Sequence, residues 1–349
     1  MSRSLSFITP HFNQFRHLKE LGELFLHWDQ NRSVSSDISS QLEWEWIIID
    51  DFSENQNELQ SLVKSWNHPQ IQLVLLSQNS GPSHARNKGI TCARGRELIF
   101  VDADIEVNLD KVIEKEIQSP FCAGLHSPSQ GSFFTRYKND YMNAIFHPFT
   151  DEGGALECSF IYGALCGWPK DLAYKWPQDL RIGEDTFLAG EILRSGQTIQ
   201  FRDDLLLTHK KSYRFLGLLR NDFRVPFYFA KAYKFRLKNK GQMKASFSHT
   251  NKYQLYSILF SGVFLIGLIY SLVSLLIRSH IQEQYLSSLL AASILLWFKF
   301  NIPLFKRLLI NQRPLGALGR VGLTLIDQWI MGFGILFGLT YFFLFEKAK

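Results

Sequence analysis

The stretch of sequence that decides the fold is Glu97-Leu98-Ile99-Phe100-Val101-Asp102-Ala103-Asp104. A short apolar run ends here in two carboxylates that are one residue apart. A run of this kind is typical of a buried strand, so the acidic side chains stand at the strand's carboxyl end. Mg²⁺ and similar hard cations prefer carboxylate and phosphate oxygens as ligands. The stretch therefore predicts an α/β protein with a site for a metal and a diphosphate at Asp102 and Asp104.

Three strand and helix patterns precede this stretch. Strands are expected at residues 5–9, 46–49 and 71–76, and apolar residues at helical spacing follow each of them, in 15–25, 59–66 and 82–93. Strands that alternate with helices favour a mostly parallel sheet, whose ligands bind beyond the carboxyl ends of the strands. The sequence therefore predicts a Rossmann-like α/β domain with a binding site along one edge of its sheet.

Polar residues follow the expected strands at this edge. Thr9 and Pro10 end the first strand, Asp50 and Asp51 end the second, and residues 78–83 follow the third. Each cluster taken alone could serve a turn or cap a helix, and capping is a direct alternative for Asp50 and Asp51 because a helix begins just after them. The recurrence of such clusters at four strand ends favours a shared site.

A second acidic pair, Glu184 and Asp185, lies about eighty residues beyond the first and follows Gly183. A carboxylate within hydrogen-bond reach of a hydroxyl can accept its proton as a new bond forms, so this pair could supply a general base. The alternative is that the two carboxylates cap the helix that starts near Thr186, since negative charge is favourable at a helix N-terminus.

Charge and hydropathy divide the 349-residue chain. Hydrophobic residues make up 46% of it, enough for a substantial core, and the net charge of +6 arises mainly from residues 210–252. The apolar stretches that follow are 253–277, 285–298 and 321–345. The first is long enough to cross a bilayer, the second is short, and the third holds Asp327 as its only charged residue. This context favours anionic lipid over nucleic acid as the partner of the basic segment.

Lysine and arginine on the short flanks of the apolar stretches set the expected orientation. The connection over 299–320 is basic, as is the segment before residue 253, whereas 278–284 carries only Arg278 as a fixed positive charge. These flanks predict a multi-pass protein of the cell (inner) membrane with a cytoplasmic N-terminal domain and a C-terminus on the far side. The apolar run after Arg3 is too short for a signal peptide, which agrees with this orientation.

Basic and aromatic residues interleave just before the first apolar stretch. The basic residues are Lys231, Lys234, Arg236, Lys238 and Lys240, and the aromatic residues are Phe227, Tyr228, Phe229, Tyr233 and Phe235. This pattern predicts an interfacial amphipathic helix whose positive charges lie near anionic lipid head groups. A charged linker helix packed on the domain is the alternative.

Several motifs, taken in order, resemble family 2 glycosyltransferases of the GT-A fold. They are Ser6-Phe7-Ile8-Thr9-Pro10, Ile48-Ile49-Asp50-Asp51-Phe52-Ser53, Gly81 to Ile90, Phe100 to Asp104, Gly163 to Trp168 and Arg181 to Leu188. The resemblance covers roughly residues 4–215. It implies a GT-A domain over 1–220, and the remaining chain is expected to form the interfacial segment over 221–252 and about three transmembrane helices over 253–349.

The resemblance implies a role for each matching position. The residues implied to bind a nucleotide-sugar donor are Thr9, Pro10, Asp50, Asp51, Arg86, Asn87 and Asp102. One of Asp50 and Asp51 would read the nucleotide base. Arg86 would contact the diphosphate through a charge-assisted hydrogen bond, with a helix-surface ion pair as the alternative.

The resemblance also implies a metal and a catalytic base. The implied ligands of Mg²⁺ or Mn²⁺ are Asp102, Asp104 and His209, although His209 could be an ordinary core or surface histidine. Asp185 matches the family's catalytic base, with Glu184 beside it.

The implied activity is inverting transfer of a sugar from a nucleotide-sugar donor, expected to be a UDP-sugar, to a hydroxyl of a lipid-linked or cell-envelope glycan acceptor. The Q-x-x-R-W string of processive synthases is missing from the sequence, which favours transfer of one sugar per encounter. Membrane lipids are expected partners and nucleic acid is not. The alternatives are transfer to a polyprenyl phosphate and, in a different class, a catalytically silent membrane scaffold. Residues 169–180 depart from the family pattern, so they predict no acceptor preference.

Overall fold

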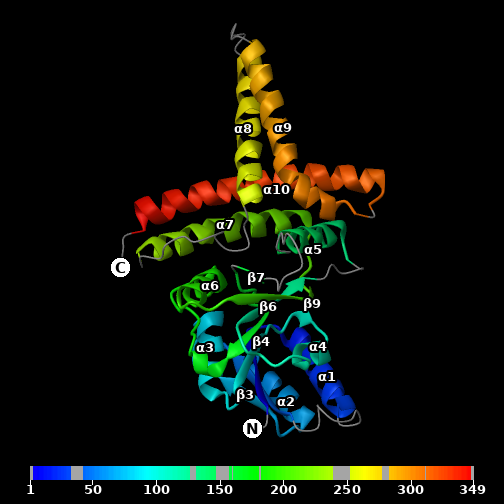
Figure 1. The fold of residues 1–349 in the computed structure, drawn as a ribbon, viewed down its shortest axis with the longest axis vertical. Coiled ribbons are helices and arrows are strands. Elements are labelled where there is room, and N and C mark those ends of the chain that lie inside the picture. The colour runs from blue at the N-terminus through cyan, green and yellow to red at the C-terminus, as the bar shows by residue number, and fades with distance from the viewer. Residues whose placement is uncertain are drawn as a thin grey trace. The chain divides into compact units, whose positions relative to one another are not determined.

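The computed structural model describes residues 3–32, 42–125, 131–146, 157–158, 160–180, 182–238, 252–276, 283–310 and 312–346. The chain divides into two compact units. The first comprises Met1–Pro128 and Phe146–Lys211, and the second comprises Ser129–Ile145 and Ser212–Lys349. The sheet belongs to the first unit, and the second is built of helices (Figure 1). The expected boundary at residue 220 differs from this division, because the second unit begins earlier and also takes up residues 129–145.

The first unit follows the predicted alternation of strands and helices. Its strands are β1 (Ser4–His11), β2 (Glu43–Asp50), β3 (Ile71–Leu75), β4 (Glu97–Val101), β5 (Ile105–Glu106), β6 (Phe121–Leu125), β7 (Glu157–Cys158), β8 (Leu165–Pro169) and β9 (Ile199–His209). Its helices are α1 (Phe15–Arg32), α2 (Gln56–Trp66), α3 (Pro82–Cys92), α4 (Leu109–Ile113), the short 3₁₀ helix η2 (Lys170–Leu172) and α6 (Glu184–Arg194). The four strands predicted from the apolar runs are all present in the structure.

In the described residues these strands form one nine-stranded sheet in the order β3-β2-β1-β4-β8-β6-β9-β5, with β7 paired to β9. Strands β3, β2, β1 and β4 run parallel to one another, whereas β8 is antiparallel to both β4 and β6. The prediction of a mostly parallel α/β sheet is therefore confirmed. The parallel arrangement brings the carboxyl ends of β2, β1 and β4 to one edge of the sheet.

Large aromatic side chains hold α1 against the sheet. Phe25 stacks on Trp46 with ring centroids 4.3 Å apart, and it meets Phe7 edge to face at 5.1 Å. All three rings are fully buried. Aromatic pairs in these geometries add to the free energy gained by burying their area. This cluster fixes β1 and β2, the strands whose ends carry the first polar clusters.

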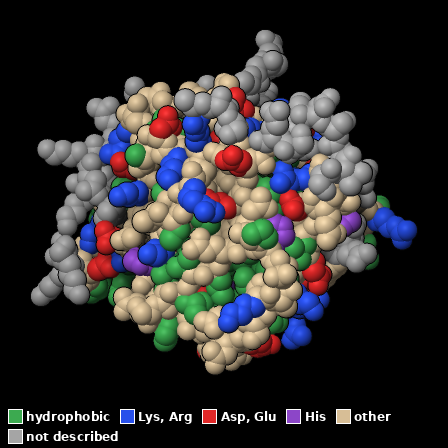
Figure 2. All heavy atoms as spheres, turned by 90° about the horizontal axis from the view of Figure 1, so that it is seen from below, with side chains coloured by type: hydrophobic (Ala, Val, Ile, Leu, Met, Phe, Trp, Pro, Cys, Tyr) green, Lys and Arg blue, Asp and Glu red, His purple; other side chains and the backbone are tan. Residues whose placement is uncertain are grey.

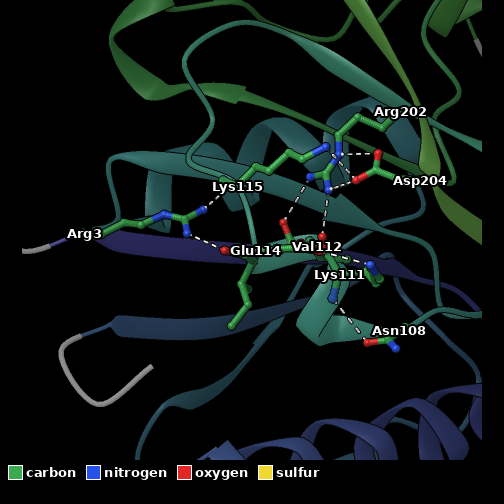
Figure 3. A network of polar contacts seen from close by, with 9 residues as sticks. Arg3, Asn108, Lys111, Val112, Glu114, Lys115, Arg202 and Asp204 are labelled. Carbon is green, nitrogen blue, oxygen red and sulfur yellow. Dashed lines mark hydrogen bonds and ion pairs between the residues drawn. The ribbon is translucent and has the colours of Figure 1, made fainter. Parts of the chain in front are cut away.

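A polar network anchors β9, the strand that ends at His209 (Figure 3). Arg202 donates to the carboxylate of Asp204 and to the backbone carbonyl of Lys111 just after α4 begins. Lys115 donates to the same carboxylate over 2.9 Å. The register of β9 against β6 shifts at this point. The network therefore ties an irregular part of β9 to α4 and holds the strand in place.

The second unit contains five α-helices in its described residues: α5 (Phe133–Phe146), α7 (Phe215–Lys238), α8 (Lys252–Leu276), α9 (Glu283–Leu308) and α10 (Pro314–Thr340), which continues as the π-helix η3 (Tyr341–Phe345). Three described segments, Lys252–Leu276, Tyr285–Leu308 and Pro314–Phe345, are long and apolar enough to cross a membrane. The expectation of three apolar C-terminal helices is confirmed.

The second apolar helix extends further than its apolar run predicts. Helix α9 continues to Leu308, so Lys299, Lys306 and Arg307 are helical instead of belonging to a basic connection. The expected loop over 299–320 is therefore wrong, since residues 309–313 alone separate α9 from α10. The charged side chains interrupt the apolar pattern of the sequence, but α9 continues through them.

Helices α7 and α10 run in the same direction and touch through their backbones. A Cβ atom added at Gly334 would press against the carbonyl oxygen of Phe223, and one added at Gly338 against that of Phe227. Further along the pair, the ring centroids of Phe227 and Phe342 are 5.0 Å apart. The glycines of α10 therefore permit an approach that no larger residue allows.

We expect Gly334→Leu to destabilise the second unit, because the new side chain must push α7 away from α10. Overpacking of this kind costs about 1–3 kcal/mol, and thermal unfolding of the full chain in detergent measures it. Gly322→Leu is the matched control, since a Cβ added at Gly322 meets nothing within 4 Å. Equal melting temperatures for the two variants would contradict the close α7–α10 contact.

Candidate functional site

The edge formed by the carboxyl ends of the parallel strands gathers the predicted acidic residues of the first unit. Asp50 is the last residue of β2, and Asp102 directly follows β4, with β1 between these two strands. On the face of the molecule in Figure 2, acidic and basic side chains are interspersed instead of forming a single basic surface.

Arg86 of α3 is the centre of the site. Its guanidinium donates to Asp102 over 2.9 Å and to Glu184 over 3.3 Å. It also lies 4.4 Å from the centroid of the Trp176 ring, and its side chain is only 4% exposed. The structure thus joins three segments that are far apart in the sequence. Helix α3 supplies the buried cation, and the end of β4 and the start of α6 each supply a carboxylate that pairs with it.

The pair Glu184 and Asp185 occupies the first turn of α6. Gly183 precedes them with a φ of +85°, a left-handed conformation that favours glycine. Asp185 accepts a hydrogen bond from the backbone N–H of Thr186 over 2.7 Å, as the capping alternative predicted. Glu184 instead turns its carboxylate to Arg86. The two neighbouring carboxylates therefore have different partners.

Burial and mutual repulsion shift the ionisation of this pair. Burial, reinforced by the charge of Asp185, raises the pKa of Glu184 to about 7, although Arg86 opposes the shift. Burial likewise raises the pKa of Asp185. The pKa of Asp102 is raised by burial, and Arg86 again acts in the opposite direction. A buried carboxyl whose pKa is raised to about 7, as in Glu184, is suited to proton transfer.

We expect activity that depends on this pair to increase as the pH rises through about 7. The raised pKa keeps a proton on Glu184 below this pH, so the charged carboxylate that pairs with Arg86 is fully formed only above it. The dependence of kcat/KM on pH measures the effect. In Glu184→Gln the like charge is removed, so the inflection due to Asp185 should move to lower pH; a profile that is flat across about pH 5.5 to 9 would contradict the assignment.

Asp104 and His209 form a second cluster at the same edge. The short strand β5 pairs with the end of β9, and Ile105 lies opposite His209. This pairing brings the Asp104 carboxylate within 3.8 Å of the His209 Nδ1, and the Gln14 amide donates to the same carboxylate over 3.3 Å. The predicted proximity of Asp104 and His209 is therefore present.

The three predicted ligands do not converge. Among the described residues, no group of three or more His, Cys, Asp or Glu side chains is placed to hold a metal ion, and Asp102 faces Arg86. The donor set nevertheless fits Mg²⁺ or Mn²⁺ chemically, because carboxylates suit both ions and a neutral imidazole can join them. The His209 Nδ1 accepts a hydrogen bond from the Lys211 backbone N–H over 3.3 Å, so a cation would bind at Nε2 or replace that hydrogen bond.

The carboxylates of Asp50 and Asp51 both accept hydrogen bonds from other groups of the protein. Asp50 accepts a hydrogen bond from the backbone N–H of Ser53 over 3.0 Å and pairs with His11 over 2.8 Å. Burial opposes its ionisation, but these hydrogen bonds hold its pKa below the usual value. Asp51 accepts from the backbone N–H groups of Ser80 and Gly81 and so shapes the loop before α3. Asp50 therefore closes the turn after β2 and does not cap α2, whose N-cap is Asn55.

Two residues predicted to bind substrate lie elsewhere. The Thr9 hydroxyl is fully buried and accepts a hydrogen bond from the Trp46 indole. The Asn87 amide is bound at both ends to the backbone of Trp176, with both distances 2.8 Å. Strand alternation turns Thr9 into the core, and the helical turn points Asn87 away from Arg86. Pro10, beside Thr9 in β1, is half-buried.

No pattern in the sequence indicated a role for Trp176 or for the exposed aromatic rings at the strand ends. Trp176 stacks on Arg86, and Asn87 fixes its backbone. Phe12 and Phe52 follow β1 and β2 and are 45% and 50% exposed. Phe52 has a φ of +65°, which is unfavourable for an aromatic residue. Exposed rings directly after strand ends are a signal that could have identified the last two, whereas the Trp176 contact depends on tertiary structure.

The match to known proteins agrees with this arrangement. Residues 6–156 match the family model described as Glycosyl transferase family 2. This segment is a family 2 glycosyltransferase domain. It contains β1 to β4 and therefore Arg86, Asp102 and Asp104. Glu184 and Asp185 lie beyond the matched segment.

Two curated relatives are similar to part of the chain. TuaG of Bacillus subtilis, named for teichuronic acid biosynthesis, is 34% identical over 116 residues, which are 33% of this chain and 40% of the relative. WcaA of Escherichia coli, named for colanic acid biosynthesis, is 32% identical over 99 residues, which are 28% of this chain and 33% of the relative. The chain thus matches less than half the length of each.

A solved structure is similar in fold. The mannosyltransferase PcManGT of Pyrobaculum calidifontis, determined with GDP-Man and Mn²⁺, aligns with a TM-score of 0.52 at 16% identity and covers 100% of this chain and 89% of its own. At this identity the likeness establishes the GT-A fold alone. The expected fold class is confirmed.

Proposed function

We propose that the protein is a membrane-bound, inverting and non-processive glycosyltransferase. It moves one sugar from a nucleotide-sugar, expected to be a UDP-sugar, to a hydroxyl of a lipid-linked or cell-envelope glycan. The observation that carries the proposal is the contact of Arg86 with both Asp102 and Glu184. Arg86 therefore lies between Asp102, where the donor diphosphate would bind, and the acidic pair, which can activate an acceptor hydroxyl.

The donor binds along the edge of the sheet in this proposal. Arg86 is released in part from its carboxylates to pair with the diphosphate, to which a guanidinium can donate two hydrogen bonds. Asp51 holds the loop before α3 in place, and the exposed Phe12 and Phe52 rings offer apolar faces to the nucleotide base. Asp50 acts mainly through the hydrogen bonds that keep this turn rigid.

The chemical step is a single displacement. The carboxylate of Asp185 takes the proton of the acceptor hydroxyl, and that oxygen forms a bond to the anomeric carbon. The bond from the anomeric carbon to the diphosphate oxygen breaks, and its electron pair leaves with the nucleoside diphosphate. One displacement inverts the anomeric centre. Glu184 pairs with Arg86, and burial keeps the pKa of Asp185 raised.

Asp104 and His209, with Asp102 nearby in the sequence, would hold a divalent cation. When bound, Mg²⁺ or Mn²⁺ neutralises the charge of the diphosphate leaving group. The protein contributes the fixed pairing of β5 with β9, which keeps Asp104 and His209 together before any ligand arrives.

We expect His209→Ala to weaken metal-dependent nucleotide binding by about 10- to 100-fold, a loss typical when support for a metal is removed. Titration of Mn²⁺ at a fixed nucleotide concentration, followed by calorimetry, measures it. His27→Ala, which changes an exposed histidine on α1, is the matched control. If the two variants bind nucleotide equally at every Mn²⁺ concentration, His209 is not a ligand.

The acceptor is assigned from the chemistry around the domain. The three apolar helices suggest a membrane protein, and both curated relatives carry names of cell-envelope polysaccharide pathways. We place the protein in the inner membrane with its catalytic domain in the cytoplasm, where nucleotide-sugars are available.

A panel of labelled nucleotide-sugars tests the proposed activity. The full chain is incubated in membranes with each donor, with Mg²⁺ or Mn²⁺, and the labelled products are extracted and identified. The proposal expects one donor to label a glycan or a lipid-linked glycan. A product in which a single sugar is joined to polyprenyl phosphate would favour the alternative acceptor, and no transfer from any donor would favour a silent scaffold.

A further inference from the structure

The helices of the second unit differ in how their apolar surfaces are arranged. Helices α8 and α9 run side by side away from α10, which lies across their ends next to α7 (Figure 1). Helix α8 contacts α10 near its middle: the Ser261 carbonyl accepts from the Trp329 indole over 2.7 Å, and Ile258 lies beside Gly332. Beyond these residues, Gly267 packs on Leu290 of α9.

The pairing of α10 with α7 restricts how α10 can enter a membrane. The two helices are in contact from Phe223 and Gly334 to Lys234, whose ammonium donates to the Glu346 carbonyl over 2.8 Å. An α10 that crossed the bilayer would therefore carry α7 into the hydrocarbon with it. Among the described side chains of α7, the basic ones are Arg220, Arg224, Lys231 and Lys234. Basic side chains at the centre of a bilayer are strongly unfavourable.

The two faces of α10 agree with a position in the plane of the membrane. Its buried polar residues point toward neighbouring helices, with Arg320 and Asp327 directed to α5 and Gln328 to α9. Arg320 pairs with Asp140, and Asp327 accepts a hydrogen bond from the Tyr137 hydroxyl over 3.1 Å. The residues that α10 and η3 expose are large and apolar: Leu315, Leu318, Ile326, Phe333, Leu336, Phe337, Tyr341, Phe343, Leu344 and Phe345. A helix with one apolar face free and its charges held by neighbours suits the boundary between head groups and acyl chains.

We propose that α8 and α9 are the two membrane-spanning helices of the described chain and that α7 and α10 lie together in the membrane interface as a platform. At about 1.5 Å per residue, α8 and α9 each exceed the thickness of the hydrocarbon core, about 30 Å. The exposed apolar face of α10 contacts lipid at the level where the hairpin enters the bilayer. The end of the chain then lies on the same side of the membrane as the catalytic domain, in contrast to the far side expected from the sequence.

Labelling of single cysteines with a membrane-impermeant maleimide tests this arrangement in cells that make the full chain. The variants are Glu58→Cys in the catalytic domain, Ser279→Cys between α8 and α9, and Lys349→Cys at the chain end, in a background whose native cysteines are replaced by serine. The proposal expects Lys349→Cys to behave like Glu58→Cys and opposite to Ser279→Cys, before and after permeabilisation. Labelling of Lys349→Cys together with Ser279→Cys would overturn it. Neither outcome depends on glycosyltransferase activity.

Fluorescence quenching by lipids that carry a nitroxide at a known depth provides a second readout. Leu318→Cys and Phe333→Cys, each labelled with a fluorophore, lie far apart along α10, and the proposal expects them to report the same shallow depth. Leu255→Cys and Ile266→Cys on α8 are the matched pair, and the second should be deeper than the first. A difference in depth between the two α10 positions as large as that of the α8 pair would show that α10 crosses the membrane.

Discussion

Asp185→Asn is expected to reduce sugar transfer by about 10²- to 10⁴-fold, the range typical for loss of a general base, while leaving nucleotide binding close to that of the unaltered chain. The amide retains the size of the carboxylate and can still cap the Thr186 N–H through its oxygen, so α6 should begin at the same residue. What it loses is the ability to accept a proton from the acceptor hydroxyl. Transfer of labelled sugar and calorimetric binding of the nucleoside diphosphate measure the two quantities separately.

Two further variants make this result specific. Asp171→Asn changes an exposed carboxylate in η2 and should leave both quantities unaltered. Glu184→Gln removes a partner of Arg86, so it should weaken donor binding more than Asp185→Asn does. If Asp185→Asn transfers sugar at the rate of the unaltered chain while Glu184→Gln does not, the base is Glu184.

Arg86→Met is expected to abolish detectable transfer and to destabilise the first unit. The substitution leaves Asp102 and Glu184 without the buried cation that pairs with both of them. Loss of one partner from a buried ion pair costs on the order of 3–5 kcal/mol, and the partial exposure of Asp102 places this case at the lower end. Thermal unfolding and donor binding measure the two effects.

The pH dependence identifies the cause of this destabilisation. Without Arg86, the pKa values of both carboxyls should rise further, and each group can take up a proton at low pH. The stability lost in Arg86→Met should therefore be largest above about pH 7, where the carboxylates are ionised, and smaller in acid. Lys88→Met on the exposed face of α3 is the control. A loss of stability that is independent of pH would contradict the charge argument.

The sheet could be predicted because its signals are local. Four apolar runs, each followed by polar residues, indicated β1 to β4 and the edge at which they end. The pairing of Arg86 with Asp102 could not be predicted in the same way, because it depends on how α3 packs on β1 and β2. The contact of Arg86 with Glu184 is harder still to predict from sequence, because α6 follows β6 and β8 in the chain and reaches the site only once those strands are in the sheet.

The positions of Thr9 and Asn87 in the structure have simple physical origins. Thr9 shares a face of β1 with Phe7, so strand alternation already placed its hydroxyl toward the core. Asn87 neighbours Arg86 in the sequence, but adjacent residues on a helix point in different directions. A motif assigns a shared role to residues that are adjacent in the sequence, whereas on a strand or helix the side chains of adjacent residues point in different directions.

The helical region shows a different limit. Hydropathy located the three apolar helices but could not distinguish a helix that crosses the membrane from one that lies along it. That distinction depends on Gly334 and Gly338, which allow α10 to touch α7. In the sequence these glycines are compatible with either arrangement.

Transfer in membranes by paired variants tests the central claim most directly. Membranes that contain the unaltered chain or Asp185→Asn, in equal amounts, are supplied with the donor selected from the nucleotide-sugar panel and with Mn²⁺, and both the nucleoside diphosphate released and the labelled product are measured. We expect the unaltered chain to form nucleoside diphosphate and labelled product in equal amounts, and Asp185→Asn to form neither. Equal transfer by the two proteins would show that Asp185 is not the base of the glycosyl transfer.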